Sequence, residues 1–146
     1  MRGTLADMIM RKVRQAARLR HRLVVVVAPF GEGKTHALHA IAAQTSAPML
    51  DLCSVFSDRM RDLTHKQRQQ QLPRLLGETI GGVEGDLVLL DGGERLFDPA
   101  RMHDSLNSLW EASRSMTIVL ALQGAEGQSQ VLLWRRQRTR RTRRQS

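Results

Sequence analysis

Aromatic side chains are scarce in this chain, which has 146 residues, no tyrosine, and aromatic residues at only 3% of its positions. Bases of single-stranded nucleic acid stack on aromatic rings, so we expect no base-stacking platform. Cysteine is almost as rare, and Cys53, the only one, cannot form an intrachain disulfide. A chain without disulfides fits the reducing cytoplasm, and a lone cysteine in an apolar stretch is expected in the core.

Long hydrophobic runs are also missing. No apolar run approaches the roughly 20 residues that cross a bilayer, so we expect no membrane span. The first 19 residues are amphipathic and basic, but no continuous apolar core with a cleavage site follows. The sequence therefore predicts no signal peptide and a cytoplasmic protein.

Acidic residues are outnumbered, but the excess of positive charge lies at one end. The formal net charge is +9, whereas residues 1–134 hold 16 basic and 14 acidic side chains. We interpret 1–134 as one domain and 135–146 as an arginine-rich tail. Such a tail can contact nucleic acid non-specifically through phosphates; a solvated tail, or an end altered by truncation or reading frame, is the alternative. The tail arginines are Arg135, Arg136, Arg138, Arg140, Arg141, Arg143 and Arg144.

Apolar periodicity predicts alternating helices and strands, and hence an α/β fold with a mainly parallel sheet. Leu5, Met8, Ile9 and Val13 indicate an amphipathic first helix. We expect strands over 23–27, 49–53, 86–91, 116–122 and 131–134. Further helices are expected over 35–45, over 57–80 with a kink or break at Pro73, and from 99 or 101 to 113.

A phosphate-binding loop is predicted between the first strand and the following helix. The octapeptide APFGEGKT follows the run LVVVV, the context that a P-loop requires. Its glycines allow the backbone to wrap a phosphate, Lys34 would reach the β- and γ-phosphates, and Thr35 would bind Mg²⁺. The expected nucleotide contacts are Ala28, Pro29, Phe30, Gly31, Glu32, Gly33, Lys34, Thr35 and His36.

Three more polar residues are candidates for the chemistry. Asp91 ends an apolar strand in the manner of a Walker B carboxylate and would hold Mg²⁺. Glu94 could fold back over Gly92 and Gly93 to activate water, or could merely flank the next turn. Gln123, at the tip of another strand, could contact the γ-phosphate or could be an ordinary strand-end amide. Because parallel strands end at one edge, we expect Lys34, Asp91 and Gln123 to converge.

The sequence does not indicate a metal site built from histidines or a catalytic nucleophile. The five histidines show no metal-ligand spacing backed by other ligands, and no Ser-His-Asp or Cys-His arrangement stands out. An arginine finger supplied by a neighbouring copy could complete the site. The candidates are Arg95, Arg101 and Arg114.

The additional strand over 49–53, which comes between the P-loop strand and the Walker B strand along the chain, resembles the ASCE branch of P-loop proteins, which includes AAA+ and RecA-like ATPases. This resemblance implies a three-layer P-loop NTPase sandwich, in which Gln123 takes the place of the AAA+ sensor-1 residue. No AAA+ lid domain follows the core.

Several segments resemble the BrxF family, the small P-loop proteins of type III BREX bacteriophage-defence systems. They are DLTHKQR at 62–68, LPRLL at 72–76, VLLD at 88–91 with Glu94, and LFDP at 96–99. The similarity covers roughly residues 5–124. It implies a cytoplasmic ATPase subunit that uses ATP and Mg²⁺ through Lys34, Thr35 and Asp91 and works with other BREX subunits. The Gly92-Gly93 pair and the arginine-rich end depart from the family's pattern.

The sequence thus predicts an ATP-hydrolysing subunit whose site is completed by homo-oligomerisation. Two alternatives remain. A nucleotide-dependent scaffold with little turnover could use the 63–76 segment as an assembly surface. A small-molecule kinase is less favoured, because no arginine-rich lid lies between the last helix and strand.

Overall fold

A computed structural model describes residues 4–29, 31, 33–93, 96–124 and 127–136. The elements follow one another as α1 (Leu5–Ala16), β1 (Leu23–Ala28), α2 (Lys34–Thr45), β2 (Met49–Asp51), α3 (Leu52–Met60), α4 (His65–Gly81), β3 (Leu87–Asp91), the 3₁₀ helix η2 (Pro99–Arg101), α5 (Met102–Ala112), β4 (Thr117–Gln123) and β5 (Gln130–Leu133). This confirms the predicted α/β class.

The strands form one sheet in the order β2-β3-β4-β1-β5. Four of them are parallel, and β5 runs antiparallel to β1. The strand that lies between β1 and β3 is therefore β4, whereas β2 lies at the edge of the sheet. A mainly parallel sheet is confirmed.

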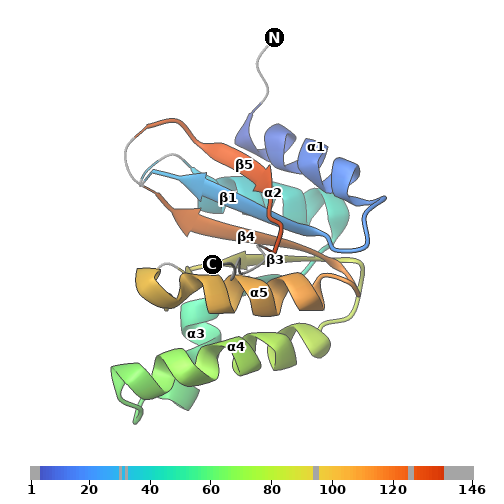
Figure 1. Cartoon of the computed structure of the whole chain (residues 1–146). Coiled ribbons are helices and arrows are strands. Elements are labelled where there is room, and N and C mark those ends of the chain that lie inside the picture. The colour runs from blue at the N-terminus through green and yellow to red at the C-terminus, as the bar shows by residue number, and fades with distance from the viewer. Residues whose placement is uncertain (1–3, 30, 32, 94–95, 125–126, 137–146) are drawn as a thin grey trace, which may run out of the picture.

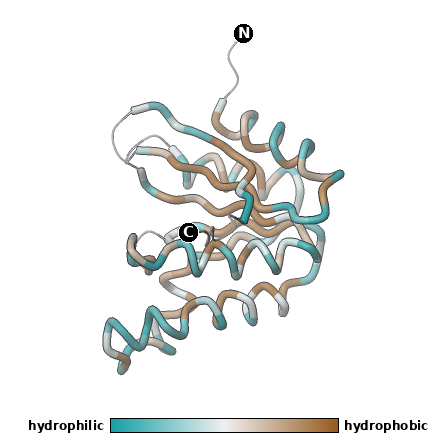
Figure 2. The backbone as a smooth tube through the Cα atoms, viewed as in Figure 1, coloured by the Kyte–Doolittle hydropathy of each residue, from teal (hydrophilic) through white to brown (hydrophobic). Residues whose placement is uncertain are grey.

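Helices cover both faces of the sheet, which gives three layers (Figure 1). Helices α1 and α2 pack on one face, and α3, α4 and α5 on the other. Alternation along β1 explains this double burial: Leu23 and Val25 join the core under α4 and α5, while Val24 and Val26 join the core under α1 and α2. Figure 2 shows the same apolar character along the strands.

The predicted helix over 57–80 is wrong in its boundaries, and the predicted strand over 49–53 is too long. Strand β2 ends at Asp51, whose side chain caps α3, and α3 begins at Leu52. The helical region then breaks at 61–64, not at Pro73, which lies inside α4. Thr64 caps α4 in a capping box with Gln67, and this fixes the helix start.

The central strand β4 offers a test of the core. Leu120 is completely buried between β1 and β3, so Leu120→Ala should lower the free energy of unfolding by about 2–5 kcal/mol. Leu19→Ala is the matched control, because Leu19 is 37% exposed. Urea denaturation followed by circular dichroism measures both changes. Equal midpoints for the two variants would contradict the burial of Leu120 in the core.

Candidate functional site

The carboxyl ends of β1, β3 and β4 lie at one edge of the sheet (Figure 1). Ala28 at the end of β1 is in register with Gln123 at the end of β4. Asp91 ends β3, the strand on the other side of β4. The predicted convergence of residues from these strands on one sheet edge is therefore confirmed for the backbone.

The loop after β1 has the backbone conformation that its glycines permit. Gly31 and Gly33 have φ values of +85° and +80°, in the left-handed region, and a Cβ at either position would meet no atom within 4 Å. Glycine is therefore favoured at these two positions because other residues would strain the backbone at a positive φ, and not because a side chain would collide with neighbouring atoms. Of the predicted phosphate contacts, Phe30 and Glu32 lie outside the described residues.

Helix α2 begins directly after this loop at Lys34. Its N-cap, Gly33, has no side chain to satisfy the first backbone N–H groups. Unsatisfied N–H groups and the helix dipole favour an anion at such an end. His36 lies in the same first turn and is exposed. The amino end of α2 thus lies at the carboxyl edge of the sheet, directly after the glycine loop.

Thr35 and Asp91 lie in direct contact, although 56 residues separate them in the sequence. The Thr35 hydroxyl donates a 2.6 Å hydrogen bond to Asp91 Oδ2, and the backbone N–H of Gly92 donates to Oδ1 at 2.9 Å. Asp91 retains only 9% exposure. Oxygen donors are what Mg²⁺ prefers, so this hydroxyl–carboxylate pair fits the predicted metal ligands.

Gln123 is exposed at the tip of β4, between the ends of β1 and β3. The next residue, Gly124, donates a backbone hydrogen bond to the Ala28 carbonyl at 2.9 Å. A Cβ at Gly124 would collide with the Val27 side chain. Gly124 therefore lets the chain leave β4 tightly against β1, and this fixes the position of Gln123.

The glycine pair after Asp91 has a packing role that the sequence did not indicate. Gly92 has φ +77°, and a Cβ there would lie 2.5 Å from Asp51 Oδ1. A Cβ on Gly93 would lie 2.8 Å from the Phe97 ring. Both glycines therefore serve close packing. Glu94 and Arg95, candidates for water activation and for an arginine finger, lie outside the described residues.

The other finger candidates differ in position. Arg101 makes a 3.3 Å ion pair with Asp104 within the η2–α5 turn. Arg114 lies just before β4, at the opposite edge of the sheet from the P-loop. Within one copy of the chain, Arg114 is therefore not brought to the Thr35–Asp91 pair.

Gln69 is a buried residue that sequence reasoning missed. It is 6% exposed, donates to the Leu96 carbonyl at 2.7 Å, and accepts from the Asp98 N–H at 3.2 Å. These bonds hold the segment that follows Glu94 against α4. Its helical spacing from Leu72 and Leu76 places Gln69 on the apolar face of α4, and this is the sequence signal that could have found it.

His65 reinforces this contact from the start of α4. Its Nε2 lies 3.1 Å from Asp98 Oδ2, while Asp98 Oδ1 accepts from the Ala100 N–H and caps η2. The hydrogen bond with His65 is the main cause that lowers the pKa of Asp98 below its ordinary value. The side chains of α4 thus fix both ends of the 96–98 segment.

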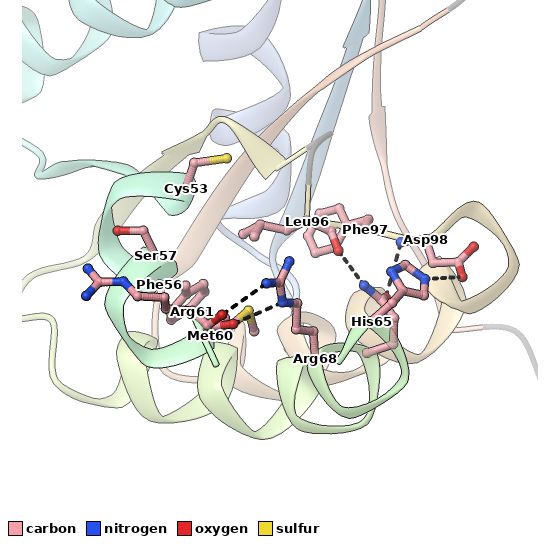
Figure 3. A pocket seen from close by; sticks show the side chains of 11 residues that line it. Cys53, Phe56, Ser57, Met60, Arg61, His65, Arg68, Leu96, Phe97 and Asp98 are labelled. Carbon is pink, nitrogen blue, oxygen red and sulfur yellow. Dashed lines mark hydrogen bonds and ion pairs between the residues drawn. The ribbon is translucent and has the colours of Figure 1, made fainter. Parts of the chain in front are cut away.

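A cavity of about 300 Å³ lies beside this segment (Figure 3). The Arg68 guanidinium lies among its lining residues and donates to the Met60 carbonyl at 3.0 Å, which holds the end of α3. Cys53 also lines the cavity, and its thiol donates to the Gly92 carbonyl at 3.0 Å. The lining residues are Cys53, Phe56, Ser57, Met60, Arg61, His65, Arg68, Gln69, Leu96, Phe97 and Asp98.

A second cavity, of about 280 Å³, lies between the amino-terminal ends of α1 and α2. Gly33 of the loop and His36 of the first α2 turn belong to its lining, so it adjoins the predicted phosphate contacts. Its walls are otherwise formed by small or apolar residues and one hydroxyl. They are Thr4, Leu5, Ala6, Ala37 and Ala40.

No protein-family model matches the chain, and no curated protein matches its sequence. Among the described residues, no helix combines the length and apolar character that crossing a bilayer requires.

We predict that Gln69→Ala loosens the 96–98 segment. The Leu96 carbonyl and the Asp98 N–H would lose their partner, at a cost of about 1–3 kcal/mol for each group that stays buried. Amide hydrogen exchange at Asp98 should accelerate relative to wild type. Gln70→Ala is the matched control, because Gln70 is exposed. Unchanged exchange at Asp98 in Gln69→Ala would disprove the clamp.

The pKa of Asp98 gives a separate test. Because its pKa is lower in the folded state, Asp98 contributes stability above the ordinary carboxyl pKa, and this is lost as the pH falls through the folded-state value. His65→Ala should raise the pKa of Asp98 toward the ordinary value, measured by NMR titration of its carboxyl carbon. His39→Ala, on α2, should leave it unchanged. An Asp98 pKa that His65→Ala does not alter would exclude the pairing.

Proposed function

We propose that this chain is a P-loop NTPase that binds ATP with Mg²⁺ at the carboxyl edge of its sheet and hydrolyses it. The observation that carries the proposal is the 2.6 Å hydrogen bond from Thr35 to Asp91. It joins the first turn of the helix after a glycine loop to a buried carboxylate at the end of a strand, as binding of Mg²⁺-ATP requires.

Each residue has a definite role in this proposal. The loop from Ala28 to Gly33 surrounds the phosphates, and Lys34 neutralises the β- and γ-phosphates. Thr35 and Asp91 hold Mg²⁺, directly or through water. Glu94 and Gln123 activate and orient the attacking water. Mg²⁺ supplies charge neutralisation on the β- and γ-phosphate oxygens when it is bound.

The cavity between α1 and α2 supports a place for the nucleoside. It adjoins Gly33 and is lined by small apolar residues and His36, so a purine could enter without displacing a large side chain. In this arrangement the phosphates lie over the loop and the base lies against the first turns of α1 and α2.

The sheet order supports assignment to the ASCE branch, because β4 separates the P-loop strand from the Walker B strand. Together with the motifs at 62–68, 72–76 and 96–99, it supports a BrxF-like subunit of a BREX antiphage complex, located in the cytoplasm and active as a homo-oligomer. In this proposal a neighbouring copy supplies the arginine finger.

The scaffold remains the second candidate, and the clamp on α4 favours it specifically. Gln69 and His65 link the 63–76 segment to residues 96–98, so a change near Asp91 could reach a surface formed by α4. A nucleotide-dependent scaffold would bind ATP through the same residues with little turnover. No corresponding observation favours a small-molecule kinase.

Lys34→Ala tests the nucleotide site. We expect it to abolish binding of a fluorescent ATP analogue, because it removes the cation that faces the phosphates. Lys66→Ala removes the same charge from the exposed face of α4 and should leave binding unchanged. Circular dichroism should show that both variants are folded. Tight ATP binding by folded Lys34→Ala would refute the proposal.

Glu94→Gln separates the enzyme from the scaffold. Loss of a general base should lower turnover by roughly 10²–10⁴-fold while ATP binding persists. Turnover per subunit should rise with protein concentration, because a neighbouring copy completes the site. Phosphate release measured across a concentration series tests both points. ATP binding with no phosphate release from wild type at any concentration would favour the scaffold.

A further inference from the structure

Several arginines gather at the amino edge of the sheet, opposite the candidate nucleotide site, and five of them are considered as one group. They come from the connection between α1 and β1, the turn between α5 and β4, and the segment after β5. In Figure 1 these segments lie on the right, whereas the arrowheads of β1 and β4 point left. We call them the amino-edge arginines: Arg20, Arg22, Arg114, Arg135 and Arg136.

Ordered contacts hold these three segments together. The backbone N–H of Arg22 donates to the Ser113 hydroxyl at 2.9 Å, and its guanidinium donates to the Arg114 carbonyl at 3.2 Å. The N–H of Trp134 donates to the Leu23 carbonyl at 2.9 Å. These bonds place Arg22 and Arg114 on hydrogen-bonded segments of the domain, and they hold Trp134, directly before the first two tail arginines, against the start of β1.

Arginines outnumber acidic residues at this edge. Glu111 pairs with Arg136 at 2.9 Å and offsets one of the five charges. Arg20, Arg114 and Arg135 are exposed. Glu84 and Asp86 are acidic and lie just before β3. They therefore limit the extent of the arginine cluster on the side of β3. A polyanion would therefore find several exposed guanidinium groups on one surface.

Aromatic rings lie beneath the arginines, but they contact each other. His21 stacks on Trp110 with ring centroids 3.5 Å apart and an interplanar angle of 5°, and His103 meets Trp134 edge-on at 5.9 Å. Burial, together with the nearby Arg114, Arg20 and Arg136, lowers the pKa of His21 against the opposing effect of Glu111. The stacked rings leave the arginines as the groups that meet a ligand.

We propose that the amino-edge arginines bind the phosphate backbone of duplex DNA without sequence specificity. Guanidinium groups pair with phosphate oxygens in bidentate geometry, and such contacts supply most non-specific DNA affinity. A duplex is favoured over a single strand because His21 already covers a face of Trp110. Five further arginines after residue 137 continue the same charge along the chain.

A protein partner fits this surface less well. Protein interfaces have an apolar centre, whereas Leu19 and Val55 are the large apolar side chains that stand exposed in the described part of the chain. Only Leu19 is next to the amino-edge arginines in sequence. DNA at the amino edge would leave the carboxyl edge open, so this inference does not rest on the proposed ATPase activity.

The test measures binding of a mixed-sequence DNA duplex to the full chain, without nucleotide, across a salt series. Arg20→Gln with Arg114→Gln should weaken binding and reduce the slope of log K against log salt by about two, close to one for each lost phosphate contact. Arg11→Gln with Arg61→Gln removes two exposed charges elsewhere and is the matched control. Intrinsic fluorescence should change on binding, because both tryptophans lie by this surface.

Further measurements distinguish DNA binding by the amino-edge arginines from binding by the arginines after residue 137 and from binding at the nucleotide site. The difference in the slope of log K against log salt between wild type and Arg20→Gln with Arg114→Gln should persist when the five arginines after residue 137 are replaced by glutamine in both full chains. Lys34→Ala should bind DNA as wild type does, so failure of the nucleotide site and failure of the DNA surface are told apart. Three outcomes would each overturn the proposal. The control pair could weaken binding equally, or binding could be lost only when the five arginines after residue 137 are replaced. The third is tighter binding of a single strand or of polyglutamate than of the duplex.

Discussion

The hydrogen bond between Thr35 and Asp91 is the contact on which the geometry of the candidate site depends. Because β4 lies between β1 and β3, the ends of those two strands are roughly 10 Å apart at the usual strand spacing. The first turn of α2 must cross the tip of β4 to reach Asp91. The left-handed Gly31 and Gly33 let the chain turn sharply enough to do so. Gln123, at that tip, consequently lies between the loop and the carboxylate.

The chain on the other side of Asp91 is constrained at both ends. Gly92 and Gly93 lie so close to the side chains of Asp51 and Phe97 that larger residues would displace them. Gln69 then holds the backbone at Leu96 and Asp98. A glycine pair in a sequence suggests a flexible backbone, but in this structure the pair permits tight packing. The segment that carries Glu94 therefore leaves and enters the core at defined points.

Much of this arrangement could be predicted from the sequence, because apolar runs and the residues that end them are local signals. They predicted the strands, the helix after the glycine loop, and Asp91 and Gln123 at one sheet edge. The break at 61–64 was missed because Pro73 is the stronger local signal, although the Thr64 capping box fixes the actual boundary. The role of Gln69 could not be predicted, because its partners are 27 and 29 residues away in the sequence.

Strand direction explains why the candidate nucleotide site and the amino-edge arginines lie at opposite edges of the sheet. Parallel β1, β3 and β4 all end at the carboxyl edge, which holds the candidate site, whereas antiparallel β5 returns the chain to the amino edge. Arg135 and Arg136 consequently follow β5 at the edge where β1 begins, beside Arg22. Residues 1–134 are nearly neutral in sum, so composition does not reveal the share of the cluster that Arg20, Arg22 and Arg114 contribute. The antiparallel direction of β5 adds Arg135 and Arg136 to Arg20, Arg22 and Arg114, which precede β1 and β4, at the edge opposite the glycine loop.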